Sequence, residues 1–288
     1  MRVGRVEAIH RYPVKSTAGE SLDQVELAAG GIPGDRSWAV RDEKRGGITG
    51  AKRFPELMNF SSRLSGPALA GRSSPTEITL PDGTQARTSD PDIAERFSLA
   101  LGHPVSLWPL QPADALDHYR HGEPTHDDME TELRAIFGRT PDEPLPDLSV
   151  FPPEMFQFAS PPGTYFDAFP LLLLTTTSLA TMQARAPEAR FDSRRFRPNF
   201  LVGDLDSSEP FPELEWCGKQ LALGDAVVDV IMACPRCVMT THGFDDLSKE
   251  PSVMRALVRE AGGNLGVYAK PRRPGRVRAG DDVRLVAD

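Results

Sequence analysis

The residues best suited to chemistry are two cysteines, Cys234 and Cys237, in the sequence CPRC. They follow an apolar run, VVDVIMA, that is typical of a strand. Four interpretations are open. The thiols could be small buried side chains, a redox pair, part of a zinc site with Cys217 and His242, or the source of one thiolate that binds a soft metal.

The residues around the pair favour the last interpretation without deciding it. A thioredoxin-like pair lies at the start of a helix, whereas Cys237 is followed by VMTTHG, which is rich in β-branched residues. A zinc ribbon needs a second close cysteine pair, and the chain has three cysteines in total. Arg236 favours a thiolate and could help to hold an anionic ligand. We expect His242 to be exposed in a loop, with a role at a substrate site as the alternative.

Three other segments place cations at turns beside strands. Residues 12–16 read YPVKS, residues 31–36 read GIPGDR and residues 196–199 read FRPN. Each segment alone is most simply a solvated charge at a turn. Together with Arg236 they supply four cations and several hydroxyl or amide groups. Such a set suits a phosphorylated anion, because a guanidinium binds phosphate bidentately and an ammonium adds a point charge.

The ordered set YPVKS, GIPGDR, FRPN and CPRC followed by VMTT resembles the MOSC family, which includes the mitochondrial amidoxime-reducing component and its bacterial homologues. The resemblance extends from about Val3 to about Leu285, and the start of the chain is similar to the β-barrel domain that precedes the MOSC domain. It implies a β-rich α+β fold in which a MOSC β-barrel-like domain follows an N-terminal β-barrel-like domain. It also implies a molybdenum cofactor, in which a pterin holds the metal through sulfur.

The resemblance carries over to individual positions of this sequence. It implies that Cys237 is the catalytic cysteine and the metal ligand, whereas Cys234 does not bind the metal. Soft sulfur donors suit molybdenum. The implied reaction removes oxygen from small N-hydroxylated or N-oxide substrates and releases water. The further positions that match cofactor-binding residues are Lys15, Ser16, Arg36, Thr177, Ser178, Arg197, Asn199, Arg236 and Tyr268.

Two other functions stay open beside the reductase. Domains of this family also occur beside cysteine desulfurases, so Cys237 could carry sulfur as a persulfide. A zinc-stabilised binding module is the third hypothesis. An iron–sulfur cluster typically needs four cysteine ligands, so we expect none on this chain. Electrons would then come from a separate flavin or iron–sulfur protein.

The elements that must position these residues are mostly short strands. In the N-terminal part, apolar alternation predicts strands at 1–10, 21–27, 37–41 and 77–80, and a helix over 90–101 with Asp90 as its N-cap. In the C-terminal part it predicts helices at 177–185 and 251–261, and strands at 157–159, 169–175, 199–202, 213–216, 221–223, 226–232, 267–270 and 283–286.

An acidic, proline-rich segment separates the two parts. Residues 123–147 hold eight acidic and two basic residues. We expect an N-terminal domain over residues 1–122, an exposed connection or lid over 123–154 with one helix at Met129–Phe137, and the MOSC domain over 155–288. The connection could dock the electron donor, although a solvated linker is the simpler interpretation.

Composition limits the partners. The 33 basic and 41 acidic residues give a net charge of −8, which provides no general attraction to nucleic acid. The apolar run at Phe169–Leu174 is far shorter than the roughly 20 residues of a membrane span. The sequence also starts without the apolar run of a signal peptide. We therefore expect a cytoplasmic protein that binds neither nucleic acid nor membranes.

Overall fold

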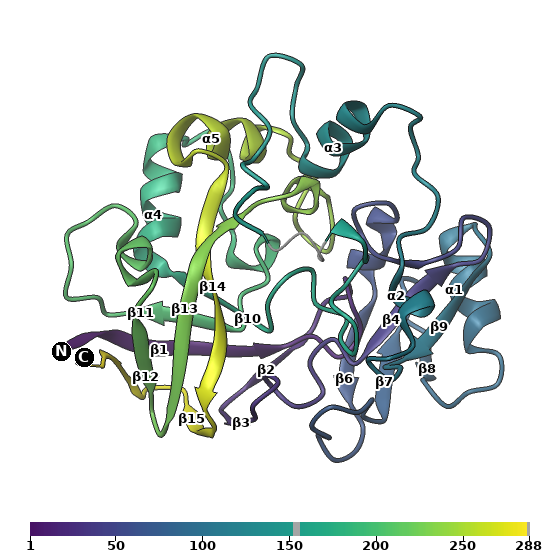
Figure 1. Ribbon diagram of the computed structural model, residues 1–288, viewed down its shortest axis with the longest axis horizontal. Coiled ribbons are helices and arrows are strands. Elements are labelled where there is room, and N and C mark those ends of the chain that lie inside the picture. The colour runs from purple at the N-terminus through teal and green to yellow at the C-terminus, as the bar shows by residue number, and fades with distance from the viewer. Residues whose placement is uncertain (152–155, 287–288) are drawn as a thin grey trace.

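The computed structural model describes residues 1–151 and 156–286, and a closed β-barrel is its largest element (Figure 1). Within these residues, seven strands close the barrel, because the last strand in the order pairs again with the first. Only the pair β10–β11 is parallel among the barrel strands described. The order is β11 (Phe200–Gly203), β10 (Leu171–Thr175), β14 (Asn264–Arg273), β13 (Ala226–Pro235), β12 (Gln220–Leu223), β16 (Asp282–Leu285) and β1 (Arg2–Arg11).

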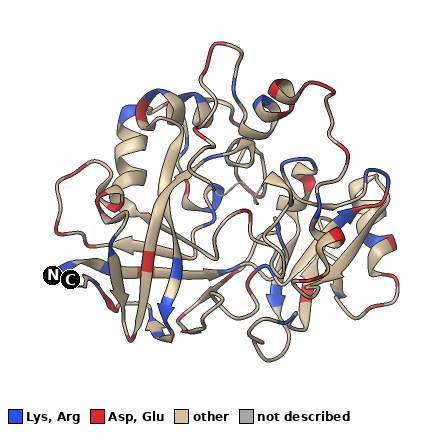
Figure 2. Cartoon of the chain, in the orientation of Figure 1, with Lys and Arg blue, Asp and Glu red and all other residues tan. Residues whose placement is uncertain are grey.

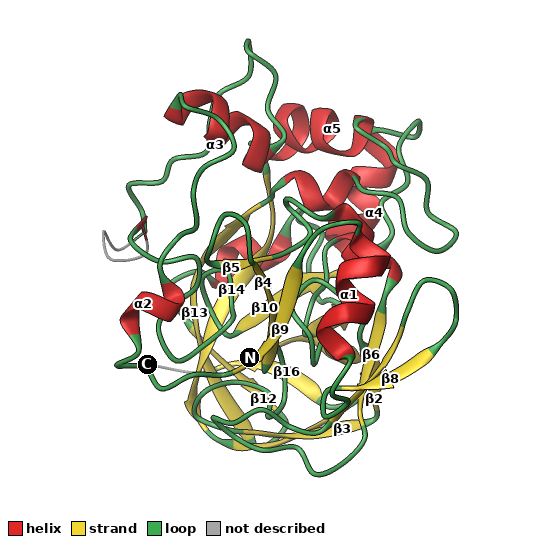
Figure 3. Ribbon diagram, turned by 90° about the vertical axis from the view of Figure 1, so that its right-hand side faces the viewer, coloured by secondary structure: helices red, strands yellow, loops and turns green. Residues whose placement is uncertain are grey.

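Alternating side chains explain how the barrel strands are buried. Leu171 and Leu173 of β10 point into the barrel core, whereas Leu174 packs under the helices α4 (Thr176–Arg185) and α5 (Ser252–Ala261). Both faces of β10 are therefore covered, and the strand is apolar at every position but Thr175. The helices α4 and α5 lie on the same side of the molecule as α3 (Met129–Phe137) (Figure 3).

The N-terminal part adds two small sheets and three short helices beside the barrel. One sheet has the order β5 (Ile48–Thr49), β4 (Trp38–Asp42) and β9 (Val105–Pro109), and the other β6 (Ser61–Leu64), β7 (Thr76–Thr79) and β8 (Gln85–Arg87). The helices of this part are η1 (Pro55–Asn59), α1 (Ile93–Leu101) and α2 (Leu116–Tyr119). Strand β2 (Glu20–Leu22) extends the barrel sheet beyond β1, and β3 (Gln24–Leu27) pairs with β15 (Gly275–Arg278).

The two parts of the chain share one of their hydrophobic cores. Met239, Phe244 and Leu247 follow Cys237 in the sequence, yet they pack among the apolar side chains of the N-terminal sheets. The partly buried side chain of Cys237 packs against the same cluster. The segment after Cys237 is therefore held by the N-terminal part as well as by the barrel.

The acidic connection contains helix α3 (Met129–Phe137), which has the predicted bounds. Asp128 caps the helix by accepting a hydrogen bond from the Thr131 amide at 2.7 Å, and Gly138 ends it with a left-handed conformation. Acidic residues gather on α3 and on the chain that leads into it (Figure 2). Residues 152–154 of the predicted connection lie outside the described residues.

The β-rich fold class is confirmed, and the structure corrects several elements. Residues 213–216 were predicted as a strand but lie in the 3-10 helix η4 (Pro212–Trp216), where the proline fixes φ and lacks the amide that a strand ladder needs. The predicted strand at 157–159 is wrong, since Phe158 forms only an isolated bridge with Arg120. Asp90 does not cap α1, because its carboxylate accepts instead from the amide of Arg87 at 2.8 Å.

Candidate functional site

A cavity lies where the barrel, the N-terminal sheets and the end of α3 meet. Its lining includes six basic side chains and one acidic side chain among the described residues. The structure brings eight of the ten predicted site residues to this cavity: Lys15, Ser16, Arg36, Arg197, Asn199, Arg236, Cys237 and Tyr268. An excess of positive charge in a cavity favours an anionic ligand.

Cys237 is the accessible thiol of the pair. Strand β13 ends at Pro235, and Cys237 precedes the 3-10 helix η5 (Val238–Thr241) in an extended conformation with partial exposure. Cys234 is buried, and its sulfur accepts a hydrogen bond from Arg236 Nη1 at 2.9 Å. Burial raises the pKa of the Cys234 thiol although Arg236 opposes this effect. Cys234 therefore positions Arg236, and Cys237 is the thiol that a ligand in the cavity can reach.

Two arginines enclose the ring of Tyr12. The guanidinium carbons of Arg197 and Arg36 lie 4.1 and 4.8 Å from the ring centroid. Burial raises the pKa of Tyr12 to about 12 and lowers the pKa of Arg197 to about 10. Arg197 Nη1 donates to the carbonyl of Thr17 at 2.5 Å, while its Nη2 is buried with no partner among the described residues.

Asp35 joins the turn at residues 31–36 to the strand entry at Asn199. Its carboxylate accepts from the Tyr12 amide at 2.7 Å, from Asn199 Nδ2 at 3.0 Å and from Arg36. Asn199 Oδ1 in turn accepts from the amide of Leu172 at 3.1 Å. Burial lowers the pKa of Arg36, but the carboxylate of Asp35 outweighs it and raises that pKa overall. The predicted Arg36 and Asn199 are thus held by one hydrogen-bonded group.

Lys15 and Lys52 share the carboxylate of Asp167. Lys15 Nζ lies 2.6 Å from Oδ1 and 2.8 Å from the carbonyl of Tyr165, and Lys52 Nζ lies 3.3 Å from Oδ2. Burial would raise the pKa of Asp167, but the two lysines hold it well below its usual value. Burial lowers the pKa of Lys15, and Asp167 only partly offsets this. Sequence reasoning missed Lys52 and Asp167, because no local motif contains them.

The backbone is strained at three of the cavity residues. Ser16, Arg36 and Arg197 have φ values of 72°, 46° and 56°, a region that side chains other than glycine rarely adopt. Each such residue costs about 1–3 kcal/mol and persists only where its surroundings fix it. The hydroxyl of Ser16 is fixed by accepting from the Ala51 amide at 2.9 Å. Strain of this kind is typical of binding sites.

Thr177 and Ser178 are the two predicted cofactor contacts that do not line the cavity. Both lie in the first turn of α4, where the side chain of Thr175 caps the helix. The Ser178 hydroxyl donates to the buried carboxylate of Glu213 at 2.5 Å, and that of Thr175 donates to the same oxygen at 2.7 Å. The hydroxyl of Ser178 is therefore bonded to Glu213 in the protein interior and does not face the cavity.

The expectation that His242 is exposed is wrong. The residue is buried, and its Nε2 lies 2.8 Å from the carbonyl of Ala51, because the segment after Cys237 packs into the N-terminal core. No group of three or more histidine, cysteine, aspartate or glutamate side chains is placed to hold a metal ion in residues 1–151 and 156–286. The described residues thus offer no four-ligand zinc site around the CPRC sequence.

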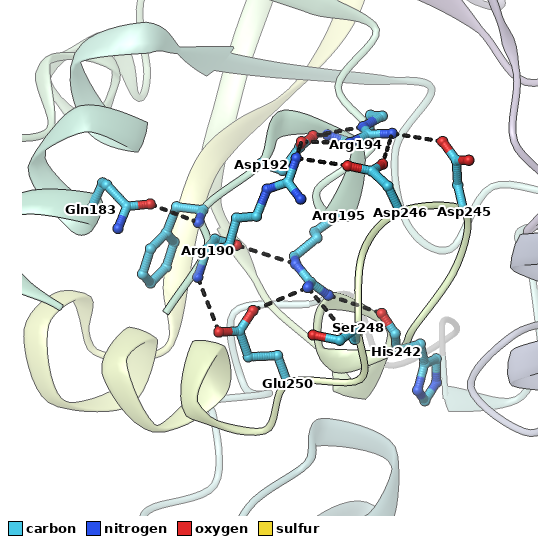
Figure 4. A network of polar contacts seen from close by, with 11 residues as sticks. Gln183, Arg190, Asp192, Arg194, Arg195, His242, Asp245, Asp246, Ser248 and Glu250 are labelled. Atoms are coloured by element: carbon cyan, nitrogen blue, oxygen red, sulfur yellow. Dashed lines mark hydrogen bonds and ion pairs between the residues drawn. The ribbon is translucent and has the colours of Figure 1, made fainter. Parts of the chain in front are cut away.

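The segment that follows Cys237 is anchored by the buried Arg195 (Figure 4). The guanidinium of Arg195 donates to the carbonyls of His242 and Ser248, both at 2.9 Å, and to the carboxylate of Glu250 at 3.1 Å. The neighbouring Arg194 points outward to acidic residues. Arg195 therefore fixes the path of the chain beyond Cys237.

Comparison with known proteins assigns the chain to a family. Residues 160–284 match the MOSC domain and residues 3–98 match the MOSC N-terminal beta barrel domain. The chain therefore belongs to the MOSC-domain proteins that carry this N-terminal domain.

The relatives of the chain include two human mitochondrial amidoxime-reducing components. The chain is 28% identical to mitochondrial amidoxime reducing component 2 of Homo sapiens, over 98% of this chain and 83% of the relative. It is 27% identical to mitochondrial amidoxime-reducing component 1 of the same species, over 99% and 84%. A molybdenum cofactor sulfurase of Oryza sativa subsp. japonica is 24% identical over 90% of this chain and 31% of that protein. These relatives support a function related to the molybdenum cofactor.

Within the part of the chain that the structure describes, no helix combines the length and the apolar character that a membrane span requires.

Proposed function

We propose that this chain binds a molybdenum cofactor and removes oxygen from N-hydroxylated or N-oxide compounds, with electrons from a separate flavin or iron–sulfur protein. One observation carries the proposal: the accessible thiol of Cys237 opens into a cavity whose described lining has six basic side chains and one acidic side chain. The cavity thus combines a soft metal ligand with groups that bind an anion. The family and the names of the relatives point to the same cofactor.

The buried polar atoms of the cavity fit such a cofactor. Arg197 Nη2 and Arg236 Nε are buried and have no hydrogen-bond partner among the described residues. A buried donor without an acceptor costs about 1–3 kcal/mol. Both atoms belong to residues that line the cavity, so a ligand with several acceptor oxygens and nitrogens would satisfy them. A phosphorylated pterin has such atoms.

The cavity residues divide into three roles. Cys237 would bind the metal, Asn199 and Tyr268 would hold the pterin, and the phosphate would lie among the cations. The residues for the phosphate and the adjoining acceptors are Lys15, Ser16, Arg36, Arg197 and Arg236. Thr177 and Ser178 have no part in this assignment, since they lie away from the cavity. When bound, the cofactor would supply the two electrons that reduction of the substrate requires.

The overall reaction converts an N–OH group, two electrons and two protons into N–H and water. The chain contributes by binding and orienting the groups that react. Burial lowers the pKa of Lys52, but the carboxylate of Asp167, 3.3 Å from Nζ, outweighs burial and raises that pKa overall. Lys52 therefore stays protonated and adds a positive charge to the cavity lining.

The test compares Cys237→Ala with wild-type protein, both made in a host that synthesises molybdenum cofactor. Elemental mass spectrometry measures molybdenum and zinc, fluorescence after oxidation measures the pterin, and reduction of benzamidoxime measures activity. We expect about one molybdenum and one pterin per wild-type chain and loss of molybdenum and activity in the variant. Cys217→Ala is the matched control, because Cys217 does not line the cavity. A Cys237→Ala protein with full molybdenum and full activity would disprove the proposal.

A sulfur carrier is the second candidate, favoured by the accessible Cys237 beside Arg236 and by the relative named as a molybdenum cofactor sulfurase. It predicts a persulfide on Cys237, seen by mass spectrometry as a gain of about 32 Da without bound pterin. The same protein preparation therefore decides between the two candidates. A cytoplasmic location and the absence of an iron–sulfur cluster stay predictions from the sequence.

A further inference from the structure

The lining of the cavity contains apolar residues as well as basic ones. Four of its lining residues come from the end of α3 and the chain that follows: Phe137, Leu148, Phe151 and Phe156. We call these four residues the apolar wall. Phe169 and Met239 also line the cavity, and the ring of Phe169 lies 5.4 Å from that of Tyr268. A ligand in the cavity thus meets both charged groups and aromatic rings.

The apolar wall is not part of a hydrophobic core in the part of the chain that the structure describes. None of its four side chains belongs to the hydrophobic core clusters found among the described residues. Phe156 is 51% exposed, and the other three are partly exposed. Aromatic and aliphatic side chains gathered at a cavity without a core to fill indicate a surface that binds an apolar group.

The end of α3 is fixed beside Cys237. A Cβ atom on Gly138 would lie 3.3 Å from the Cα of Val238, so helix α3 ends in contact with the residue that follows Cys237. The carbonyl of Gly138 accepts from Arg255 of α5, and Arg255 also pairs with Glu143 at 2.9 Å. These contacts anchor the chain to the MOSC domain at Gly138 and at Glu143. The position of Phe137 in the cavity is therefore set by the fold.

We propose that the apolar wall is the substrate-binding side of the cavity and selects compounds that carry the N–OH group on a flat aromatic body. The inference rests on the proposed function, because it places the N–OH group of the substrate near Cys237. The four wall residues carry no charge, so they favour a neutral ring over a small polar substrate. Burying one ring against them corresponds to a preference of about 10- to 100-fold over a methyl group in its place.

The test compares benzamidoxime with acetamidoxime, which differ in phenyl against methyl. The variants are Phe137→Ala and Phe151→Ala, with Phe137→Leu as a conservative replacement and Leu99→Ala as a control, because Leu99 is 75% exposed on α1 and does not line the cavity. In the molybdenum-loaded enzyme we expect the KM for benzamidoxime to rise about 10-fold in both alanine variants. The kcat/KM for acetamidoxime and the molybdenum content should stay within about 2-fold of wild type.

Titration calorimetry of each amidoxime provides a second readout that does not require turnover. Wild-type protein should bind benzamidoxime about 10-fold more tightly than acetamidoxime, and Phe137→Ala should remove most of this difference while Phe137→Leu keeps part of it. Equal binding of both compounds by wild type, or an unchanged ratio in both alanine variants, would overturn the inference. A chain that binds benzamidoxime selectively but contains no molybdenum would refute the proposed function and leave the apolar wall supported.

Discussion

Replacing Arg195 with methionine tests whether one buried side chain holds the segment that follows Cys237. Arg195 is 1% exposed and donates to two backbone carbonyls at 2.9 Å and to Glu250 at 3.1 Å. Removing one partner of a buried ion pair costs about 3–5 kcal/mol. The carbonyl bonds would be lost as well, but the chain can turn those groups toward water, so their energies do not add in full. We expect the free energy of unfolding to fall by about 3–5 kcal/mol.

Urea unfolding followed by far-UV circular dichroism measures this loss. Arg194→Met is the matched control, because the side chain of Arg194 is 41% exposed and pairs with acidic residues at the surface. Such exposed pairs contribute about 0–1 kcal/mol. Molybdenum retention should also fall in Arg195→Met, since the anchored carbonyl of His242 lies five residues after Cys237. Equal losses of stability in the two variants would refute the reasoning.

Two further substitutions test buried polar groups. Asn199→Asp would place a second carboxylate about 3.0 Å from that of Asp35. The free energy of unfolding should fall by about 2–4 kcal/mol at pH 8 and by less at pH 5, where one carboxyl group can hold a proton. Urea midpoints that differ from wild type equally at both pH values would contradict this prediction. Glu213→Gln tests a carboxyl group whose pKa burial raises against the hydrogen bonds from Ser178 and Thr175. The folded state therefore binds the proton of Glu213 more tightly than the unfolded state does. The protonated carboxyl group stabilises the folded protein fully below the unfolded pKa of about 4.3, and this contribution is lost as pH rises through the raised pKa. We expect wild type to lose more stability than Glu213→Gln over this range, and parallel urea midpoints from pH 4 to pH 8 would argue against a raised pKa.

The parts of the site that could be predicted are those encoded in short turns. Lys15, Arg36 and Arg197 reach the cavity because each lies in or beside a turn that is fixed locally at the end of a strand. Lys52 and Asp167 have no such signal, since their ion pair joins segments far apart in the sequence. The apolar wall was not predicted for a related reason, because three of its four residues lie in the 123–154 segment, whose composition indicates an exposed connection.

For the fold as well, only the features with a local sequence signal could be predicted. Helix α3 was predicted with its observed bounds because its cap, its periodicity and its terminal glycine are all local. The pairing of β1 with β11 and β16 has no local signal, because an alternating strand shows which face is buried and not which strand lies beside it. The strand predicted at residues 213–216 is wrong because Pro212 fixes φ and lacks an amide, which favours the 3-10 helix that begins there.

The position of β1 between β11 and β16 has a consequence for synthesis of the protein on the ribosome. The barrel neighbours of β1 become available only after the chain up to Gly203 and up to Leu285 has been translated. Until then the nascent chain exposes the apolar face of β1, which makes it a binding site for chaperones. Pairing between such distant segments also slows folding. Cys237 and Lys15 therefore come together only after the span from β1 to β16 has been translated, so insertion of a cofactor would follow synthesis of this span.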